Sequence, residues 1–302
     1  MYDLMILGGG PAGLAAAVYA IRRRLNVLLI GDNLGGKTGW HLDVPWLEEH
    51  HVITGEEVVR KLKGEIQDLD YARVLDRATR VETIDGGFRA HIASGDRFEA
   101  RALVIATGAR PQTLHVRGEE KYRYKGVTYS ALSYAPAMAD KTVAVIGDGP
   151  LALRSTAELL HSAARVYLIA PTAGMLETPL GRCLQDESHF SMYEGYFVSE
   201  IRGRDYAEEL VVRSGDGIAR SLKVDCIFVE VGLAPNSEPV RHLVRCDEKG
   251  HILIDHRART SRQGVFAAGD VTNACVEQVL VAVGEGIKAT LSASEYLLSS
   301  EF

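Results

Sequence analysis

The strongest constraint on the fold is a segment that the chain carries twice. "YDLMILGGGPAGLAAAVYAIRRRLNVLLIGD" covers residues 2–32 and "KTVAVIGDGPLALRSTAELLHSAARVYLIAP" covers residues 141–171, with Gly8 and Gly147 equivalent and 139 residues apart. Each copy has an apolar strand, a glycine turn, an alanine-rich helix and a second apolar strand. This order is typical of a βαβ unit, so two copies predict two Rossmann-like domains.

The composition bounds the kind of protein. The 302 residues are 46% hydrophobic and 25% charged, which is normal for a globular protein with a sizeable core. The net charge of -6 favours neither nucleic acid nor an anionic membrane as the main partner. Four scattered cysteines without metal-like spacing lead us to expect reduced thiols, a cytoplasmic location and no metal site. No apolar run approaches the length of a membrane span.

The first glycine turn, "GGGPAG" at Gly8–Gly13, fits the dinucleotide pattern G-x-G-x-x-G. Gly8 permits the tight turn, Gly10 lets backbone approach a pyrophosphate, and Gly13 lets the helix pack close to the strand. Asp32 is the candidate for a ribose hydroxyl, although Gly31 takes the position directly after the second strand. The alternative is a purely structural glycine turn.

Four motifs along the chain carry a family resemblance. "GGGPAG", "ATGARP", "VGLAPN" and "GVFAAGDVTN" occur in that order at suitable distances. Together they resemble the two-dinucleotide flavoproteins (the pyridine nucleotide-disulfide oxidoreductase family), and specifically their low-molecular-weight thioredoxin reductase branch. The resemblance covers essentially the whole chain. It implies an α/β fold of two Rossmann-like, three-layer ββα domains, with the second inserted in the first, and a homodimer.

The resemblance also implies where the cofactor lies. An FAD-binding domain is expected at residues 1–113 and 242–302, with an inserted NAD(P)-binding-like domain at residues 114–241. The helix that begins at "EQV" is expected to face the flavin, where its N-terminus favours the negative charge of the reduced ring. The implied cofactor-binding residues are Gly8, Gly10, Pro11, Ala12, Gly13, Asp32, Lys37, Ala78, Ala106, Thr107, Gly108, Gly269, Asp270, Gln278 and Val279.

One segment departs from the family in its chemistry. "GVTYSALSYAP" resembles the C-x-x-C segment of thioredoxin reductases, with Ser130 and Ser133 where the cysteines stand and Tyr134 replacing an acidic residue. Serine cannot form a disulfide, and its hydroxyl is far too basic to act as a thiolate. We therefore expect no dithiol chemistry here. Cys275, next to the flavin-facing helix, is the candidate for a replacement thiol; the alternative is a small packing residue.

The second glycine turn also keeps the family's sequence pattern but lacks residues that the family uses for binding. Gly147, Gly149 and Ala152 fit G-x-G-x-x-A, but the arginines that hold the NADPH 2′-phosphate in the family are missing. The residues at those positions are Ala170, Pro171, Thr172 and Leu176. NAD(P)H is therefore a doubtful cofactor, and we expect NADPH and NADH to reduce the flavin poorly and without clear preference. The alternatives are a structural remnant or a site for another ligand.

Two further departures concern the loop after the second strand. Lys37 stands where the family usually has Gln, and Trp46 stands where a flavin-contacting Asn is usual. An indole at this position would stack near the flavin and narrow the site. The alternative is that Trp40 and Trp46 anchor the loop.

These features favour an FAD-dependent oxidoreductase that lacks the redox dithiol and the 2′-phosphate clamp. Such a protein passes electrons directly at the flavin to or from a ferredoxin-like carrier or a small acceptor. One alternative places another nucleotide, even a second flavin, in the inserted domain. The other is an FAD-binding regulatory protein with little turnover.

Overall fold

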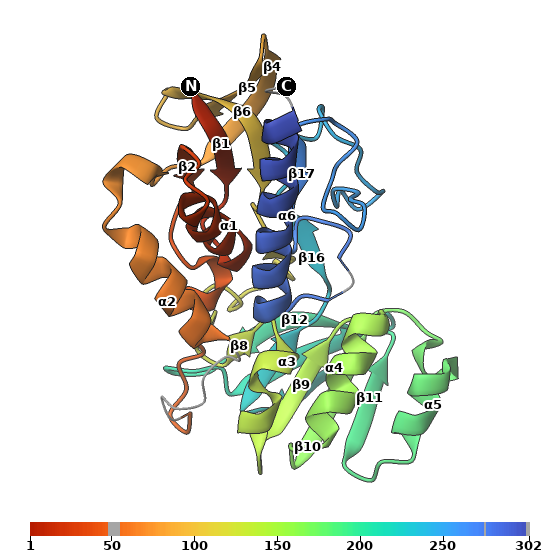
Figure 1. The fold of residues 1–302 in the computed structure, drawn as a ribbon. Coiled ribbons are helices and arrows are strands. Elements are labelled where there is room, and N and C mark those ends of the chain that lie inside the picture. The colour runs from red at the N-terminus through yellow and green to blue at the C-terminus, as the bar shows by residue number, and fades with distance from the viewer. Residues whose placement is uncertain (48–54, 275, 300–302) are drawn as a thin grey trace. The chain divides into compact units, whose positions relative to one another are not determined.

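The computed structural model describes residues 1–47, 55–274 and 276–299. The chain divides into two compact units (Figure 1). Unit 1 comprises residues 1–39, 54–110 and 234–302, and unit 2 comprises residues 40–53 and 111–233. Unit 1 is thus built from both chain ends, with unit 2 inserted. The division differs from the expected boundaries at three places: residues 40–47 and 111–113 lie in unit 2, and residues 234–241 lie in unit 1.

Unit 1 contains one large sheet. Its strands are β1 (Tyr2–Leu7), β2 (Val27–Ile30), β3 (Arg73–Val74), β4 (Ala78–Ile84), β5 (Gly87–Ile92), β6 (Arg97–Ile105) and β17 (Val265–Ala267). The order is β3-β2-β1-β6-β5-β4, with β17 paired to β6. Neighbours among β3, β2, β1, β6 and β17 are parallel, and β5 and β4 continue as an antiparallel meander. A hairpin with its turn around Ser94–Asp96 joins β5 to β6.

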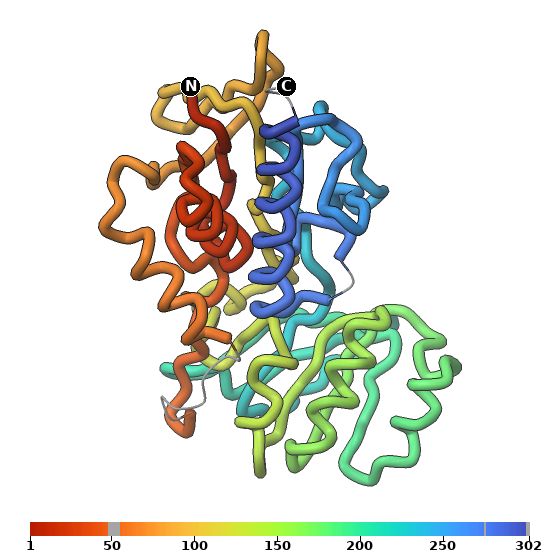
Figure 2. The backbone as a smooth tube through the Cα atoms, in the orientation of Figure 1, coloured from red at the N-terminus to blue at the C-terminus, as the bar shows by residue number. Residues whose placement is uncertain are grey.

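Helices cover one face of this sheet. They are α1 (Pro11–Arg22), α2 (Glu56–Gln67) and α6 (Val279–Ser299). Because successive side chains of a strand point to opposite faces, Leu4 and Ile6 of β1 pack with the helices, whereas Met5 and Leu7 pack on the meander side. Helix α6 runs beside α1 in Figure 2, and Thr290 Oγ1 donates to Ala16 O at 3.1 Å.

Unit 2 repeats the layering around a second sheet. Its parallel strands are β8 (Val127–Thr128), β9 (Thr142–Ile146), β10 (Arg165–Ala170), β11 (Phe190–Glu194) and β15 (Cys226–Val229). An antiparallel layer consists of β12 (Tyr196–Arg202), β13 (Glu209–Ser214) and β14 (Ala219–Lys223). The helices are α3 (Ala131–Tyr134), α4 (Pro150–Leu160) and α5 (Pro179–Gln185).

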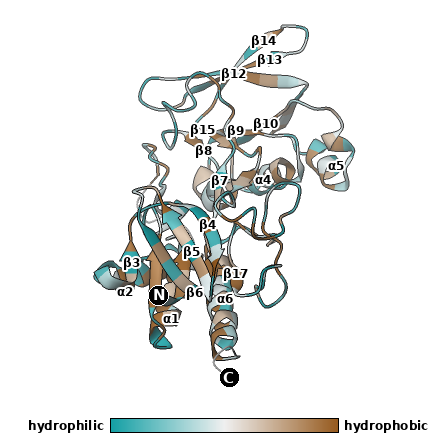
Figure 3. Cartoon of the chain, turned by 90° about the horizontal axis from the view of Figure 1, so that it is seen from above, coloured by the Kyte–Doolittle hydropathy of each residue, from teal (hydrophilic) through white to brown (hydrophobic). Residues whose placement is uncertain are grey.

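The alternation of β9 shows how the three layers of unit 2 are held. Val143 and Val145 pack into the core that contains α4, and Ala144 and Ile146 pack into the core that contains β13. Hydrophobic colour accordingly marks the central strands of both sheets in Figure 3. The predicted α/β fold with three-layer ββα domains is confirmed.

The sequence repeat corresponds to two equivalent structural units, β1-α1-β2 and β9-α4-β10. In both, the helix begins at a proline directly after its N-cap glycine, which is Gly10 for α1 and Gly149 for α4. The short strands β7 (Ala109–Pro111) and β16 (Leu233–Pro235) pair with each other where the chain passes between the units. The described residues also form the 3₁₀ turns η1 (Gly36–Gly39), η2 (Asp70–Ala72), η3 (Ala135–Met138) and η4 (Met175–Glu177).

Candidate functional site

The first glycine turn is packed so closely that only glycine fits at three of its positions, Gly8, Gly9 and Gly13. A Cβ at Gly9 would lie 2.0 Å from Asn33 O. Gly8 has φ +112°, and a Cβ there would lie 2.1 Å from Ala106 O. A Cβ at Gly13 would lie 1.8 Å from Gly8 O. The turn therefore brings the "GGGPAG" and "ATG" motifs into direct contact, as a close helix–strand approach requires.

Gly10 differs from its neighbours in being open. Its φ is -74°, and the nearest atom to a Cβ built there is Gly36 Cα at 3.9 Å. It is the N-cap of α1, which has Pro11 in its first turn, no side-chain cap and no acidic residue in the first turn. Within the part of the chain that the structure describes, no capping side chain accepts a hydrogen bond from the first backbone N–H groups of this helix, an arrangement that suits an anion such as a pyrophosphate.

The loop that follows β2 is folded onto this turn. Gly35 N donates to Gly9 O at 2.8 Å, and Gly36 N donates to Asn33 Oδ1 at 2.8 Å. A Cβ at Gly36, which has φ +59°, would lie 2.9 Å from Gly10 Cα. Lys37 is therefore held on a backbone that touches the glycine turn.

The Gly269–Asp270 turn reaches the same place from the other end of the chain. A Cβ at Gly269 would lie 3.1 Å from Ala12 Cβ, and Gly269 N donates to Glu285 Oε2 at 2.8 Å. Asp270 Oδ2 lies 2.7 Å from Lys37 Nζ. Three segments predicted separately thus converge, and the fold brings Lys37 and Asp270 together.

Hydrogen bonds join the "VGLAPN" motif to the "ATGARP" motif. Thr107 Oγ1 donates to Asn236 O at 2.7 Å, and Asn236 Nδ2 donates to Thr107 O at 2.9 Å. Asn236 N also donates to Gly108 O at 2.9 Å. Asn236 and Glu285 were not among the predicted site residues. Asn236 is the last residue of the "VGLAPN" motif, and that motif could have identified it as a site residue. No sequence motif identified Glu285.

The remaining residues predicted for FAD lie at the edges of the site or in the core. A Cβ at Gly31 would lie 2.5 Å from Gly9 N, so no side chain fits directly after β2, and the next residue, Asp32, is exposed. Ala78 is buried at the start of β4. Gln278 precedes α6, whose first residue is Val279, and accepts a hydrogen bond from Ala282 N at 2.9 Å.

The S-A-L-S segment forms a single helical turn in unit 2. Ser130 Oγ and Ser133 Oγ are hydrogen-bonded at 2.9 Å. The buried carboxylate of Glu230 accepts a hydrogen bond from Ala131 N at 2.7 Å. Tyr134, also buried, accepts from Leu42 N at 3.0 Å and donates to Trp40 O at 3.2 Å. Tyr134 thus ties α3 to the loop that begins at residue 40.

Both tryptophans of that loop pack against other residues of unit 2. Trp46 packs against the core that contains α4, and Lys141 Nζ lies 4.8 Å from the centroid of its ring. The rings of Trp40 and Tyr124 have centroids 5.9 Å apart. These contacts support the interpretation of Trp40 and Trp46 as loop anchors.

The second glycine turn keeps the frame of a nucleotide site. A Cβ at Gly147 would lie 2.5 Å from Glu230 O and 2.9 Å from the Cβ of the buried Ala152, whereas one at Gly149 would meet nothing within 4 Å. A carboxylate of this turn accepts a hydrogen bond from the residues after β10: Thr172 Oγ1 donates to Asp148 Oδ2 at 3.2 Å.

The described cysteines, Cys183, Cys226 and Cys246, are free thiols. Cys226 is buried in β15, and burial raises the pKa of its thiol. Desolvation likewise raises the pKa of Cys246, and Cys183 is exposed. Cys275 lies outside the described residues. Across residues 1–47, 55–274 and 276–299, no group of three His, Cys, Asp or Glu side chains is arranged to hold a metal ion. None of the helices assigned in those same ranges is long and apolar enough to span a bilayer.

Comparisons with known proteins agree with this geometry. The pyridine nucleotide-disulphide oxidoreductase family model matches residues 2–286. A subunit of alkyl hydroperoxide reductase from Escherichia coli (strain K12) is 32% identical over 317 residues, which cover 99% of this chain and 59% of that protein. The corresponding protein from Pseudomonas aeruginosa is 32% identical over 308 residues, covering 98% and 58%. The chain thus spans about three fifths of the length of these relatives.

Solved structures show the same fold. Thioredoxin reductase from Streptococcus pyogenes MGAS5005 has a TM-score of 0.85 at 28% identity, covering 99% of both chains. Thioredoxin reductase from Giardia duodenalis has a TM-score of 0.84 at 27% identity, covering 98% of this chain and 99% of that one. The predicted thioredoxin-reductase-like fold is confirmed, and the chain belongs to the pyridine nucleotide-disulphide oxidoreductase family.

Proposed function

We propose that this protein is an FAD-dependent oxidoreductase that exchanges electrons directly at its flavin, without a dithiol relay. The observation that carries the proposal is the hydrogen bond of 2.9 Å between Ser130 Oγ and Ser133 Oγ, at the positions where the family resemblance expects cysteines. Two paired hydroxyls cannot take up electrons as a disulfide does. The electron partner is then a ferredoxin-like carrier protein or a small acceptor.

The described residues of unit 1 fit the cofactor. The uncapped N-terminus of α1 and the open face of Gly10 suit a pyrophosphate. When bound, a flavin supplies the ring that accepts and donates electrons, and the residues of the chain bind and orient it. Helix α6 begins at Val279 with no acidic residue in its first turn. Its N-terminal dipole therefore favours negative charge nearby, and we assign Gln278 and Val279 to the flavin side of the site.

We propose that the residues of unit 2 give the protein little preference for NADPH over NADH. Two residues after β10 donate to carboxylates of other segments. Thr172 Oγ1 donates to Asp148 of the second glycine turn, and Gly174 N donates to Glu194 Oε1, at the end of β11, at 2.6 Å. These are carboxylates in the region where a 2′-phosphate needs matching donors. This supports the expectation that NADPH has no advantage over NADH and that both reduce the flavin poorly.

Anaerobic titration of the FAD-loaded protein with NADH, NADPH and reduced ferredoxin tests the proposal, with flavin absorbance as the readout. We expect ferredoxin to reduce the flavin and the two nicotinamide nucleotides to reduce it slowly and similarly. Rapid reduction by micromolar NADPH, with a clear preference over NADH, would contradict direct carrier-driven reduction. A flavin that no donor reduces would favour a regulatory FAD-binding protein.

Two simpler measurements complete the test. The flavin content of the purified protein distinguishes one FAD per chain, as proposed, from a second flavin in unit 2. Light scattering coupled to gel filtration gives the molar mass, for which we propose a homodimer. A cytoplasmic location also stays a proposal, and fractionation of the native cells tests it.

A further inference from the structure

In unit 2, the end of β11 places a carboxylate beside the last residue of β10. The parallel register of these strands pairs Ala170 with Glu194, and each is the last residue of its strand. In Rossmann domains that bind NAD, a carboxylate at the end of the second strand accepts a hydrogen bond from the 2′-hydroxyl of the adenine ribose. Unit 2 has the buried Ala170 at that position, so the neighbouring strand supplies the carboxylate there.

The carboxylate of Glu194 contacts the loop that follows β10. Gly174 N donates to Glu194 Oε1 at 2.6 Å. In the sequence, Gly174 lies between Thr172 and Leu176, two of the positions at which the family resemblance expects residues that hold a 2′-phosphate. A donor of this loop that a phosphate could use is therefore bonded to a carboxylate of the chain itself. An ionised carboxylate accepts about four hydrogen bonds, so Glu194 retains capacity for a hydroxyl of a ligand.

A second carboxylate binds the same loop. Thr172 Oγ1 donates to Asp148 Oδ2 at 3.2 Å, and both Asp148 and Glu194 are exposed. Arg154 belongs to α4, and its Nε donates to Pro150 O at 3.4 Å within that helix. The loop after β10 thus has its side-chain hydroxyl and one backbone N–H directed at anions. Like charges repel a phosphate dianion at such a place, whereas a neutral hydroxyl is accepted.

We infer that Glu194 replaces, from the neighbouring strand, the carboxylate that β10 lacks, so that unit 2 accepts an adenine ribose with a free 2′-hydroxyl and excludes one with a 2′-phosphate. The same carboxylate accepts a hydrogen bond from the hydroxyl and repels the phosphate, which makes Glu194 a specificity-determining residue. The inference rests on the proposed lack of an NADPH preference and goes beyond it by naming the residue that rejects the phosphate. It concerns nucleotide binding and not the rate of flavin reduction.

Calorimetric titration of the FAD-loaded protein with NAD⁺ and NADP⁺ tests the inference, because the oxidised nucleotides bind without reducing the flavin. We expect NAD⁺ to bind about fivefold or more tightly than NADP⁺. Glu194→Gln keeps an oxygen that accepts from Gly174 N and removes the charge. The ratio of the Kd of NADP⁺ to the Kd of NAD⁺ should therefore fall about fivefold.

Glu158→Gln is the matched control. Glu158 is also an exposed carboxylate of unit 2, but it lies near the C-terminal end of α4, about two turns from the second glycine turn. The control should leave the ratio of the two dissociation constants unchanged. Asp148→Asn removes the second carboxylate at the loop and should lower the ratio in the same direction as Glu194→Gln. Thermal melting checks that each variant folds.

Salt separates charge repulsion from a change of loop shape. Screening weakens repulsion between exposed charges, so the ratio should fall with rising ionic strength in the native protein and change little in E194Q. A folded E194Q variant with the native ratio overturns the inference. So does a native protein that binds NADP⁺ as tightly as NAD⁺, or one that binds neither. The direct exchange of electrons at the flavin is tested separately, by reduction with ferredoxin, and none of these results decides it.

Discussion

Ser130 and Ser133 face each other across the single turn of α3, with their Oγ atoms 2.9 Å apart. The backbone of this turn is held by the buried carboxylate of Glu230, and Tyr134 holds its far end. Two side chains with this separation and direction are close to the arrangement that a disulfide between them requires.

We therefore expect Ser130→Cys/Ser133→Cys to form a disulfide on oxidation. Thiol titration of the denatured protein before and after reduction should show two more reducible thiols than in the native chain, and the single variant Ser130→Cys should show no new disulfide. The native chain should not reduce thioredoxin. If it does so efficiently, a thiol elsewhere is responsible, and Cys275→Ser tests whether it is that thiol.

Substitutions at two glycines of the first turn should affect protein stability and FAD affinity differently. Gly10 has an ordinary φ and free space, so Gly10→Ala should change the free energy of unfolding by no more than about 0.5 kcal/mol. The added methyl group would stand on the side proposed for the pyrophosphate, so FAD affinity should fall at least tenfold, and Gly10→Val should lower flavin occupancy further.

Gly13→Ala is the contrasting variant. Its Cβ would lie 1.8 Å from Gly8 O, and relief of this overlap should cost about 1–3 kcal/mol of stability. Urea unfolding monitored by circular dichroism measures both stabilities. A Gly10→Ala variant that binds FAD as tightly as the native protein would show that the pyrophosphate does not lie against Gly10.

Tyr134 should stabilise unit 2 through its hydroxyl. Tyr134→Phe removes the acceptor of Leu42 N and the donor to Trp40 O. Because Leu42 is buried, its N–H group would be left without this partner, and we expect a loss of about 1–3 kcal/mol in the free energy of unfolding. Tyr71→Phe is the control, since Tyr71 is 72% exposed and should change stability little.

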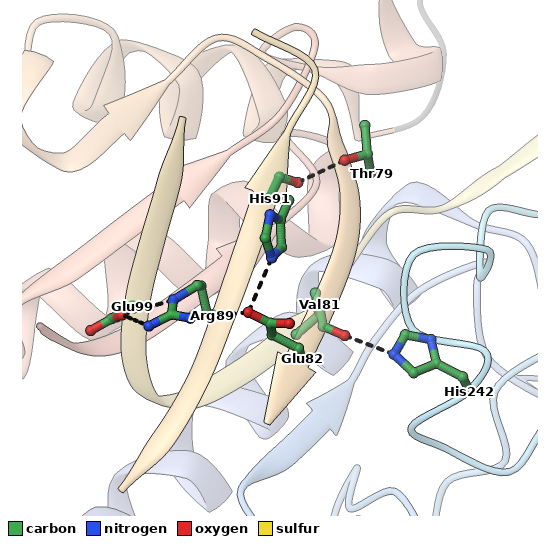
Figure 4. Close-up of polar contacts among 7 residues, drawn as sticks. All are labelled: Thr79, Val81, Glu82, Arg89, His91, Glu99 and His242. Carbon is green, nitrogen blue, oxygen red and sulfur yellow. Dashed lines mark hydrogen bonds and ion pairs between the residues drawn. The ribbon is translucent and has the colours of Figure 1, made fainter. Parts of the chain in front are cut away.

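A polar cluster on the meander of unit 1 should make stability depend on pH (Figure 4). Glu82 Oε1 lies 3.2 Å from His91 Nε2 and 3.1 Å from Arg89 Nη1, while Arg89 Nη2 lies 2.6 Å from Glu99 Oε1. Contacts with His91, and then with Arg89, lower the pKa of Glu82 below its ordinary value. Nearby, His242 Nε2 is 2.8 Å from Val81 O.

A carboxyl group with a lowered folded-state pKa stabilises the protein above its unfolded-state pKa and loses this effect as the pH falls through the folded-state pKa. Glu82→Gln should therefore be less stable than the native protein at pH ~7, and the difference should narrow below pH ~4. Urea midpoints across this range measure the effect. Glu57→Gln, which removes an exposed pair with Arg60 at 3.9 Å, should show little difference at either pH.

The repeat around Gly8 and Gly147 was sufficient to predict both βαβ units, because strand, turn and helix signals there are local. Glycine conformations, helix starts and apolar periodicity depend on neighbours in the chain. The order of four motifs identified the family for the same reason, since each is a short continuous segment. The antiparallel layer β12–β14 was not predicted, and its strands carry many half-exposed or polar positions.

Contacts between distant segments were decided only by the folded chain. The sequence around Lys37 does not indicate Asp270 as its partner, and the sequence around Thr107 does not indicate Asn236. In the folded chain Lys37 forms an ion pair with Asp270, and Thr107 forms a hydrogen bond with Asn236. Leu42 and Val44 belong to the core of unit 2, although their place in the sequence follows the first βαβ unit. Such pairings depend on which surfaces of the chain are buried against each other in the folded protein. A sequence pattern predicts whether a residue is buried, but it does not identify the residue that it contacts.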